Sequence, residues 1–236
     1  MNAALLTLMP LLAADGGPFS HQNLRFAGLF VICLIIAIAV HEFAHAFAAD
    51  KLGDGTPEAE GRLTLNPVAH ADPIGTLILP LVLTVMQTGF LFGWGRPVNT
   101  QPRNYTRKVS MRAGMALVAF AGPLSNLLQA ALAIALAAGL SAAGVAISTD
   151  VKESPLALFF TLNLVLFMFN LLPIHPLDGG KVFSWAFGAK WAPVDEFLGR
   201  YGGIVILVLV LSPIPILGYL LWPVLDLGQR AFAAVL

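Results

Sequence analysis

The chain alternates between long apolar stretches and short polar connections. The first apolar stretch runs almost without interruption from Phe26 to Val40, and four more follow: Ile74–Trp94, Met111–Ile147, Pro155–Ile174 and Gly202–Trp222. Each of these four is close to or longer than the roughly 20 residues that an α-helix needs to cross a bilayer. The pattern predicts an all-α, polytopic transmembrane helix bundle with about five to six membrane segments.

Proline and glycine interrupt several of these stretches. Gly122-Pro123 lies inside Met111–Ile147 and predicts a kink or a break there. Pro213 and Pro215 interrupt the last stretch, so we expect it to bend back instead of crossing cleanly. The first fourteen residues are apolar but lack the basic start of a signal peptide, and we expect a short membrane or interfacial segment.

Composition supports a membrane protein. Hydrophobic residues make up 58% of the chain, charged residues only 11%, and the mean hydropathy is +0.81. Soluble domains carry about 25% charged residues. The formal net charge is zero, which argues against a nucleic-acid partner, and the single cysteine, Cys33, excludes an internal disulfide. The lipid bilayer is therefore the expected surrounding of the chain.

The residues that follow the first apolar stretch suggest metal chemistry. Positions 41–45 read His-Glu-Phe-Ala-His. On a helix, His41 and His45 lie on one face and can hold one zinc ion, while Glu42 can act on a water molecule beside it. Ionisable side chains cost about 2.5–3.5 kcal/mol each at the centre of a bilayer, so three together need a reason. The alternative is a buried histidine pair that is satisfied by neighbours on the helix.

A second motif ends the stretch at 155–174. It runs from Asn170 to Gly180 and contains Asp178 in a Pro-Leu-Asp-Gly-Gly sequence. Zinc that is held by two histidines usually takes a third protein ligand, and Asp178, at a helix exit, is the best candidate. Taken alone this sequence indicates a turn. Paired with the His-Glu motif, it favours a metal ligand.

A shared zinc ion constrains the topology. If His45 and Asp178 bind the same ion, their helix exits face the same side of the membrane, so an even number of crossings separates them. The stretches 111–147 and 155–174 already supply two crossings. Segment 74–94 is therefore predicted to be a re-entrant hairpin, or to lie against the bundle, with Pro80 and Gly89 as possible bend points.

Basic residues predict the orientation. Most of them fall in connections that this topology places on one side, whereas the short opposite loop near Asp150 carries only Lys152. By the positive-inside rule, the zinc site should lie near the cytoplasmic face of the cell membrane. The residues on that side are Lys51, Arg62, Arg96, Arg103, Arg107, Lys108, Arg112, Lys181, Lys190 and Arg200.

These motifs resemble the site-2 protease family of intramembrane zinc metalloproteases. The resemblance rests on residues 41–45, on Ala121-Gly122-Pro123 with Asn126 after it, and on residues 170–180, so it spans roughly residues 40–181. Residues 62–76 and 93–98 are similar to those of the compact bacterial branch, which implies a bacterial-type inner membrane. Some members add PDZ or CBS domains, for which this chain has no room.

The resemblance implies specific roles. His41, His45 and Asp178 would be the zinc ligands, Glu42 the catalytic acid/base, and Asn170 a contact to the substrate or the developing oxyanion. The whole chain, 1–236, would form a single integral-membrane metalloprotease domain with its catalytic core at about 24–181. Family members cleave peptide bonds in or near transmembrane helices of other proteins, often in regulated intramembrane proteolysis, so the expected partners are transmembrane protein substrates.

Several polar residues keep open roles. His175, three residues before Asp178, is interpreted as a polar residue at the mouth of the site, with a ligand-supporting contact, an alternative ligand and a pH-sensitive gate as alternatives. His70 is a structural hydrogen-bonding residue or else a ligand or gate. Asn126 either packs between helices or reaches the catalytic cleft. Segment 96–104 is either an extended edge for strand addition or a plain connector.

Two other classes of function compete with a protease. A divalent-metal transporter would line a pathway with His, Asp and Asn, but it would more naturally spread ionisable groups over several helices and depths. A non-proteolytic membrane scaffold would keep the fold without the chemistry, which the intact Glu42 disfavours. The pattern therefore favours a zinc metalloendopeptidase. The sequence does not predict an oligomeric state.

Overall fold

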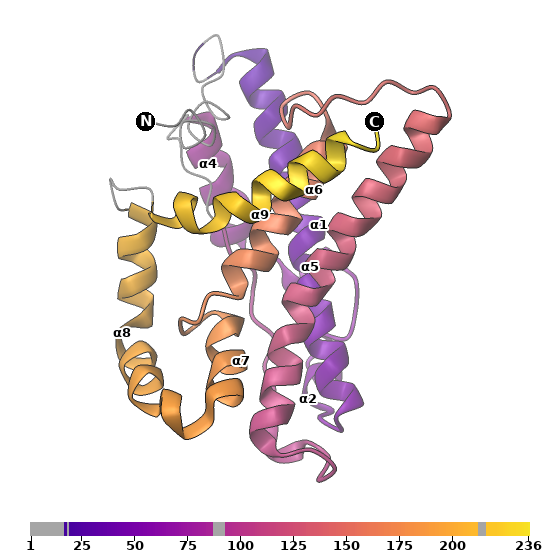
Figure 1. The fold of residues 1–236 in the computed structure, drawn as a ribbon. Coiled ribbons are helices and arrows are strands. Elements are labelled where there is room, and N and C mark those ends of the chain that lie inside the picture. The colour runs from indigo at the N-terminus through magenta and orange to yellow at the C-terminus, as the bar shows by residue number, and fades with distance from the viewer. Residues whose placement is uncertain (1–16, 18, 87–92, 212–215) are drawn as a thin grey trace.

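The computed structural model describes residues 17, 19–86, 93–211 and 216–236 (Figure 1). Within these residues all named elements are helical, which confirms the predicted all-α class. The elements are α1 (His21–Lys51), α2 (Thr56–Ala59), α3 (Pro67–His70), the π-helix η2 (Pro73–Ile78), α4 (Leu79–Val85), the 3₁₀-helix η3 (Pro102–Asn104), α5 (Met111–Ala142), α6 (Pro155–Asn170), α7 (Asp178–Phe187), the 3₁₀-helix η4 (Gly188–Trp191), α8 (Ala192–Leu211) and α9 (Ile216–Ala233).

Helices α1 and α5 are the long members of the bundle. They contain 31 and 32 residues, and among the described residues they are the two helices whose length and composition suffice to cross a membrane. Serine caps start both of them: Ser20 accepts from the N–H of Asn23, and Ser110 from that of Ala113. The apolar segment 73–85 and helix α6 are shorter. The predicted count of five to six membrane segments stays a prediction.

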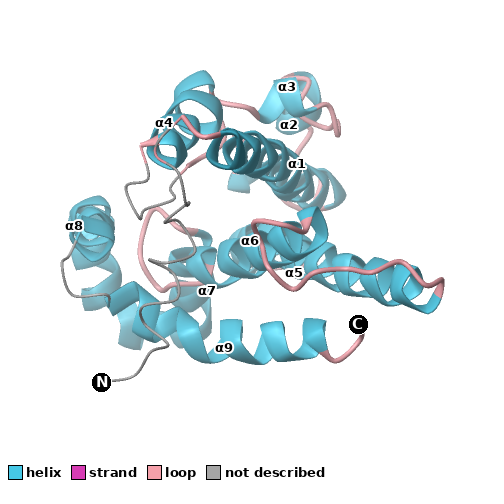
Figure 2. Cartoon of the chain, turned by 90° about the horizontal axis from the view of Figure 1, so that it is seen from above, coloured by secondary structure: helices cyan, strands magenta, loops and turns pink. Residues whose placement is uncertain are grey.

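Helix α5 is the centre of the packing. It contacts α1, α6 and α7, while α6 also contacts α1 and α9. The view along the bundle in Figure 2 shows α1, α5 and α6 side by side, with α9 running along the other side of α5 and α6. Buried alanines such as Ala37, Ala133 and Ala137 let the helices approach closely, as small residues do in membrane bundles.

The sequence predicted a kink or a break at Gly122-Pro123, and the break is wrong. Helix α5 continues through Pro123 without interruption from Met111 to Ala142. Pro123 is buried, and packing of α5 against three other helices holds its backbone in helical geometry. Neighbouring helices commonly make proline tolerable inside membrane helices in this way.

The two ends of segment 74–94 lie beside each other. Asp72 caps the start through hydrogen bonds from the N–H groups of Ile74 and Gly75. At the return, the Trp94 N–H donates to the Gly75 carbonyl at 3.1 Å, and the Thr76 hydroxyl donates to the Trp94 carbonyl at 2.7 Å. The two ends of the segment therefore meet, whereas residues 87–92 lie outside the described residues and the re-entrant hairpin stays a prediction.

The predicted extended segment near 96–104 is shorter than expected. Residues 95–101 carry no helix, and Gly95 forms an isolated antiparallel bridge with Ala71. Residues Pro102–Asn104 instead form the 3₁₀-turn η3, closed by a hydrogen bond from the Tyr105 N–H to the Pro102 carbonyl. The non-helical segment that begins at Gly95 therefore ends at Gln101.

The polar connections gather at one end of the bundle. Figure 1 shows the end of α1 with α2, the start of α5, and the turn from α7 to α8 at the lower end, whereas the α5–α6 connection lies at the upper end. The segments rich in basic residues thus share one end, and the orientation in a cell membrane stays a prediction. Expectations for the first fourteen residues, Gly89, Pro213 and Pro215 concern positions outside the described residues.

Candidate metal centre

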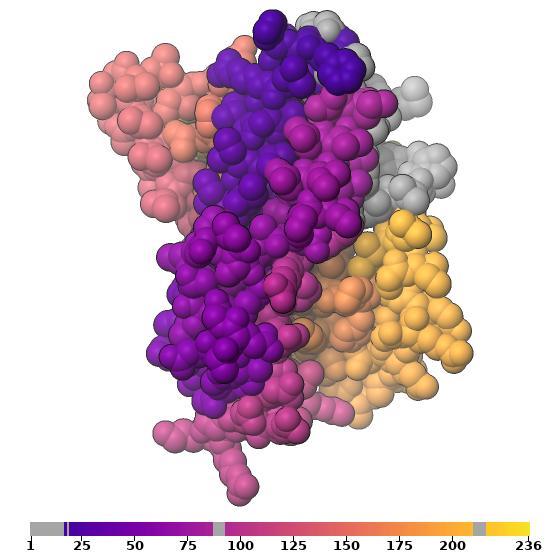
Figure 3. All heavy atoms as spheres, turned by 180° about the vertical axis from the view of Figure 1, so that it is seen from behind, coloured from indigo at the N-terminus to yellow at the C-terminus, as the bar shows by residue number. Residues whose placement is uncertain are grey.

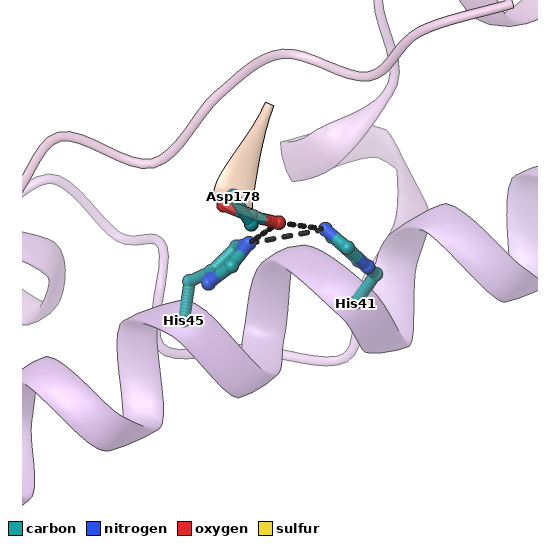
Figure 4. A group of neighbouring side chains, drawn as sticks. All are labelled: His41, His45 and Asp178. Carbon is teal, nitrogen blue, oxygen red and sulfur yellow. Dashed lines mark hydrogen bonds and ion pairs between the residues drawn. The ribbon is translucent and has the colours of Figure 1, made fainter. Parts of the chain in front are cut away.

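Three side chains converge between α1 and the start of α7. His41 Nε2 and His45 Nε2 are 3.0 Å apart, and each lies 3.3 Å from Asp178 Oδ2. Figure 4 shows both imidazoles rising from one face of α1 toward the Asp178 carboxylate. Among the described residues, these three form the group of His, Cys, Asp and Glu side chains that could hold a metal ion.

The spacing of these atoms fits zinc. Tetrahedral zinc has bonds of about 2.0–2.1 Å to imidazole nitrogen and carboxylate oxygen, so two of its ligand atoms lie about 3.3–3.4 Å apart. The observed separations of 3.0–3.3 Å are close to that value. Two nitrogens and one oxygen also match the protein donors of catalytic zinc sites, in which the fourth position is kept for water or substrate. The three residues predicted from the sequence therefore come together in a geometry suited to the ion.

Asp178 reaches the site because a glycine follows it. Helix α7 begins at Asp178, and Gly179 lies against the backbone of the turn that follows α6. A Cβ atom at residue 179 would lie only 2.2 Å from the Leu172 carbonyl oxygen and 2.4 Å from that of Leu171. A side chain at Gly179 would therefore push the start of α7, and Asp178 with it, away from α1.

Gly122 keeps the space beside the histidines open. A Cβ atom at residue 122 would lie 2.4 Å from His45 Nε2 and 2.6 Å from His41 Nε2. Those are the two nitrogens that face the candidate ion. The sequence suggested Gly122-Pro123 as a kink or a break, but this glycine lets α5 approach the ligands without filling the space between them.

Hydrogen bonds at the far side of each imidazole orient the two histidines. His41 Nδ1 is 2.6 Å from Asn126 Oδ1, and His45 Nδ1 is 2.7 Å from the Val118 carbonyl oxygen. An acceptor at each Nδ1 fixes the proton there and directs Nε2 toward the metal. Hydrogen-bond partners of metal-binding histidines commonly have this effect. Asn126 thus reaches the cleft, the alternative to simple packing that the sequence left open.

Asn163 extends this network and escaped sequence reasoning. The Asn126 amide donates to Asn163 Oδ1 at 2.9 Å, and the Asn163 amide donates to the Phe159 carbonyl. Both asparagines are fully buried. An asparagine in the middle of the apolar stretch 155–174 was the available signal, because a polar group in such a helix requires a partner.

Glu42 lies next to the ligands but points to a different partner. Its Oε2 accepts a hydrogen bond from the backbone N–H of Val98 at 3.0 Å. The carboxylate therefore lies between the metal-binding face of α1 and segment 95–101.

Asn170, the other predicted catalytic residue, is partly buried at the end of α6 and donates to the Leu166 carbonyl at 2.9 Å. Its catalytic role stays a prediction.

His175 and His70 hold other parts of the structure. His175 Nε2 lies 2.7 Å from Asp195 Oδ1, and Ser184 donates to the same carboxylate, so this trio ties α7 to α8. His70 is fully buried, with Nε2 2.7 Å from the Thr64 carbonyl oxygen. Burial lowers the pKa of His70 below its usual value. These contacts agree with structural roles for both residues.

Comparison with known proteins places the chain in a family. The sequence profile described as "Peptidase family M50" matches residues 142–211. The chain is 37% identical over 229 residues to "Putative zinc metalloprotease YwhC" of Bacillus subtilis, an alignment that covers 92% of this chain and 96% of that protein. The chain belongs to peptidase family M50. "Putative zinc metalloprotease Rip2" of Mycolicibacterium smegmatis is 30% identical over 195 residues, covering 81% of this chain and 71% of that protein. No solved structure matches the chain significantly.

Membership in M50 confirms the resemblance to site-2 proteases that the motifs indicated. It also confirms zinc as the expected cofactor, because the relatives' names and the His-His-Asp cluster agree on it. The M50 match and the two apolar helices long enough to span a bilayer support membrane association. The chain is therefore a zinc metalloprotease of M50 type, and the catalytic roles of its individual residues stay predictions.

Proposed function

We propose that this chain is a zinc-dependent intramembrane endopeptidase that cleaves peptide bonds in or near the transmembrane helices of other membrane proteins. The observation that carries the proposal is the convergence of His41, His45 and Asp178 on one point with Glu42 beside it. The M50 relatives supply the reaction class. A role in regulated intramembrane proteolysis at the cytoplasmic face of the bacterial cell membrane completes the proposal.

Each residue has a distinct task in this mechanism. His41, His45 and Asp178 hold zinc, which supplies Lewis-acid chemistry toward water and the scissile carbonyl. Glu42 accepts the proton of the attacking water and then returns it to the leaving amine, as a general base followed by a general acid. Asn126 and the Val118 carbonyl keep the imidazoles oriented. The amide of Asn170 is proposed to donate to the developing oxyanion.

The surroundings of the site favour a membrane substrate. His41 and His45 follow directly on the apolar stretch that ends at Val40, on the same continuous helix α1. A transmembrane segment can therefore reach the site without leaving an apolar environment. The ends of a helix unwind more easily than its middle, and water is available near the polar end of the bundle, so we propose cleavage close to that boundary.

The ligand arrangement disfavours the transporter alternative. A transport pathway needs several metal-binding positions along its depth. In the part of the chain that the structure describes, the metal-capable residues form one group at a single depth between α1 and α7. Glu42, in contact with segment 95–101 instead of the ligand group, also suits a proton carrier better than a ligand.

The experiment compares wild type with Glu42→Gln in liposomes that contain a model transmembrane substrate. Glu42→Gln keeps the size of the side chain but cannot accept a proton. We expect the wild type to cleave, and Glu42→Gln to bind zinc equally while cleaving at least about 100-fold more slowly, since general acid–base catalysis contributes roughly 10²–10⁴-fold. Zinc flux across the liposome with no cleavage by wild type would support the transporter instead.

A further inference from the structure

The backbone of residues 95–101, here called the strap, lies on α1 beside Glu42. A Cβ atom at Gly95 would meet the Ile38 side chain at 2.4 Å and the Glu42 side chain at 3.7 Å, so the strap touches the helix surface itself. Three residues further on, the Val98 N–H donates to Glu42 Oε2 at 3.0 Å. The strap therefore contacts the side chain assigned above as the general base.

The start of the strap is fixed by a buried arginine. Arg62 is only 4% exposed, and its guanidinium donates to the carbonyls of Arg96 and Ala69. Next to this contact, the Arg96 N–H donates to the His70 carbonyl at 2.8 Å. The Arg62 guanidinium thus joins residue 69 to the strap at residue 96. In Figure 3 the purple segment after α1 lies beside the magenta segment that leads to α5.

The end of the strap is fixed by a buried aspartate. Asp54 is fully buried, and its carboxylate accepts from the Gln101 N–H at 2.6 Å and from the Asn104 amide at 3.0 Å. The hydroxyl of Thr56 donates to the same carboxylate at 2.6 Å. A buried charge is costly unless such bonds compensate it. Arg62 at the start of the strap and Asp54 at its end, each with its charge compensated by hydrogen bonds, therefore hold Val98 in a defined place.

We propose that the strap is a positioning device for the general base: the Val98 N–H fixes the Glu42 carboxylate, and Arg62 and Asp54 act through the strap. This inference rests on the proposed peptidase function. The Glu42 side chain has three rotatable bonds, so α1 alone does not fix its carboxylate. One hydrogen bond to Oε2 restricts it and leaves Oε1 to meet the attacking water. Misplacement of a catalytic group by about 1 Å can lower a rate on the order of 100-fold.

The test compares Val98→Pro with Val98→Ala in the full-length, zinc-loaded protein acting on the model transmembrane substrate. Both variants lose the valine side chain, but Val98→Pro also loses the N–H. We expect kcat of Val98→Pro to lie about 10- to 100-fold below that of Val98→Ala, with KM within about threefold and the zinc content of the two variants equal. A role in substrate binding would instead raise KM, and a merely structural role would lower zinc content.

A second variant protects the test against misfolding. Incorporation of the α-hydroxy analogue of valine at position 98 replaces the amide by an ester, which removes the N–H and keeps the side chain. We expect the same fall in kcat relative to the amide. Arg62→Lys, which keeps the charge but not the fork to two carbonyls, should also lower kcat at unchanged zinc content. Arg107→Lys, an exposed change outside the strap, should not.

Two results would overturn the inference. If Val98→Pro cleaves as fast as Val98→Ala and the ester variant as fast as the wild-type amide, the hydrogen bond does not position Glu42. If they cleave faster, the strap is a latch that restrains Glu42. In either case wild-type cleavage leaves the proposed function standing, whereas absence of cleavage by the wild type would overturn the proposed function itself.

Discussion

Replacement of Asn126 by alanine should weaken zinc binding although Asn126 does not touch the ion. Its Oδ1 lies 2.6 Å from His41 Nδ1, and the two side chains are buried. In Asn126→Ala the Nδ1–H of His41 has no acceptor at that place, and a buried donor without a partner costs about 1–3 kcal/mol. Loss of a residue that is hydrogen-bonded to a metal ligand typically lowers metal affinity about 10- to 100-fold, which is about 1.4–2.8 kcal/mol. The two estimates agree.

The assay is competition for zinc against a chromogenic chelator, in detergent at neutral pH. Gln129→Ala is the matched control, because Gln129 is also a buried amide on α5, and its amide contacts the Ala37 carbonyl instead of a histidine. We expect Asn126→Ala to bind zinc about 10- to 100-fold more weakly than wild type, and Gln129→Ala to bind it with nearly unchanged affinity. Equal affinity of Asn126→Ala and wild type would refute the orienting role of this hydrogen bond.

Three further substitutions test the structure. Gly122→Ala should lose zinc, because its methyl group would lie 2.4 Å from His45 Nε2, whereas Gly139→Ala on the same helix meets no atom within 4 Å and should keep it; metal analysis after dialysis checks both. Gly179→Ala should lower both stability and zinc content, since the Leu172 carbonyl oxygen would lie 2.2 Å from the new atom; an unchanged thermal midpoint would contradict the close packing of α7 on the turn after α6. Burial alone would raise the pKa of Asp54, but hydrogen bonds from Gln101, Thr56 and Asn104 lower it below its usual value, so its stabilisation is complete above about pH 4 and is lost as the pH falls through the lowered pKa. The difference in unfolding free energy between wild type and Asp54→Asn should therefore be larger at pH 7 than at pH 3, and a constant difference would contradict it.

The ligands could be predicted from the sequence because their geometry is largely local. Two histidines four residues apart share a helix face in any helix, so His41 and His45 follow from helical periodicity alone. Asp178 required one further step, the expectation that zinc held by two histidines takes a third protein ligand, here at a helix exit. The structure brings all three together.

The supporting residues could not be predicted because they depend on packing between distant parts of the chain. Asn126 is separated from His41 by 85 residues, and Val98 from Glu42 by 56. Neither pair has a fixed spacing that a motif could reveal. Local propensity also did not reveal that α5 continues through Pro123, where contacts of α5 with its neighbours preserve a helix that proline can break.

Zinc titration of the metal-free protein tests the central claim most directly. Bound zinc and the cleavage rate of a model transmembrane substrate would be measured on the same samples, for wild type and for Asp178→Asn. We predict that wild-type cleavage rises in proportion to bound zinc and saturates at one ion per chain, and that Asp178→Asn needs far more zinc to reach the same occupancy, because one of the three ligands is lost. Cleavage by the metal-free protein, or equal zinc affinity of the two proteins, would contradict the assignment.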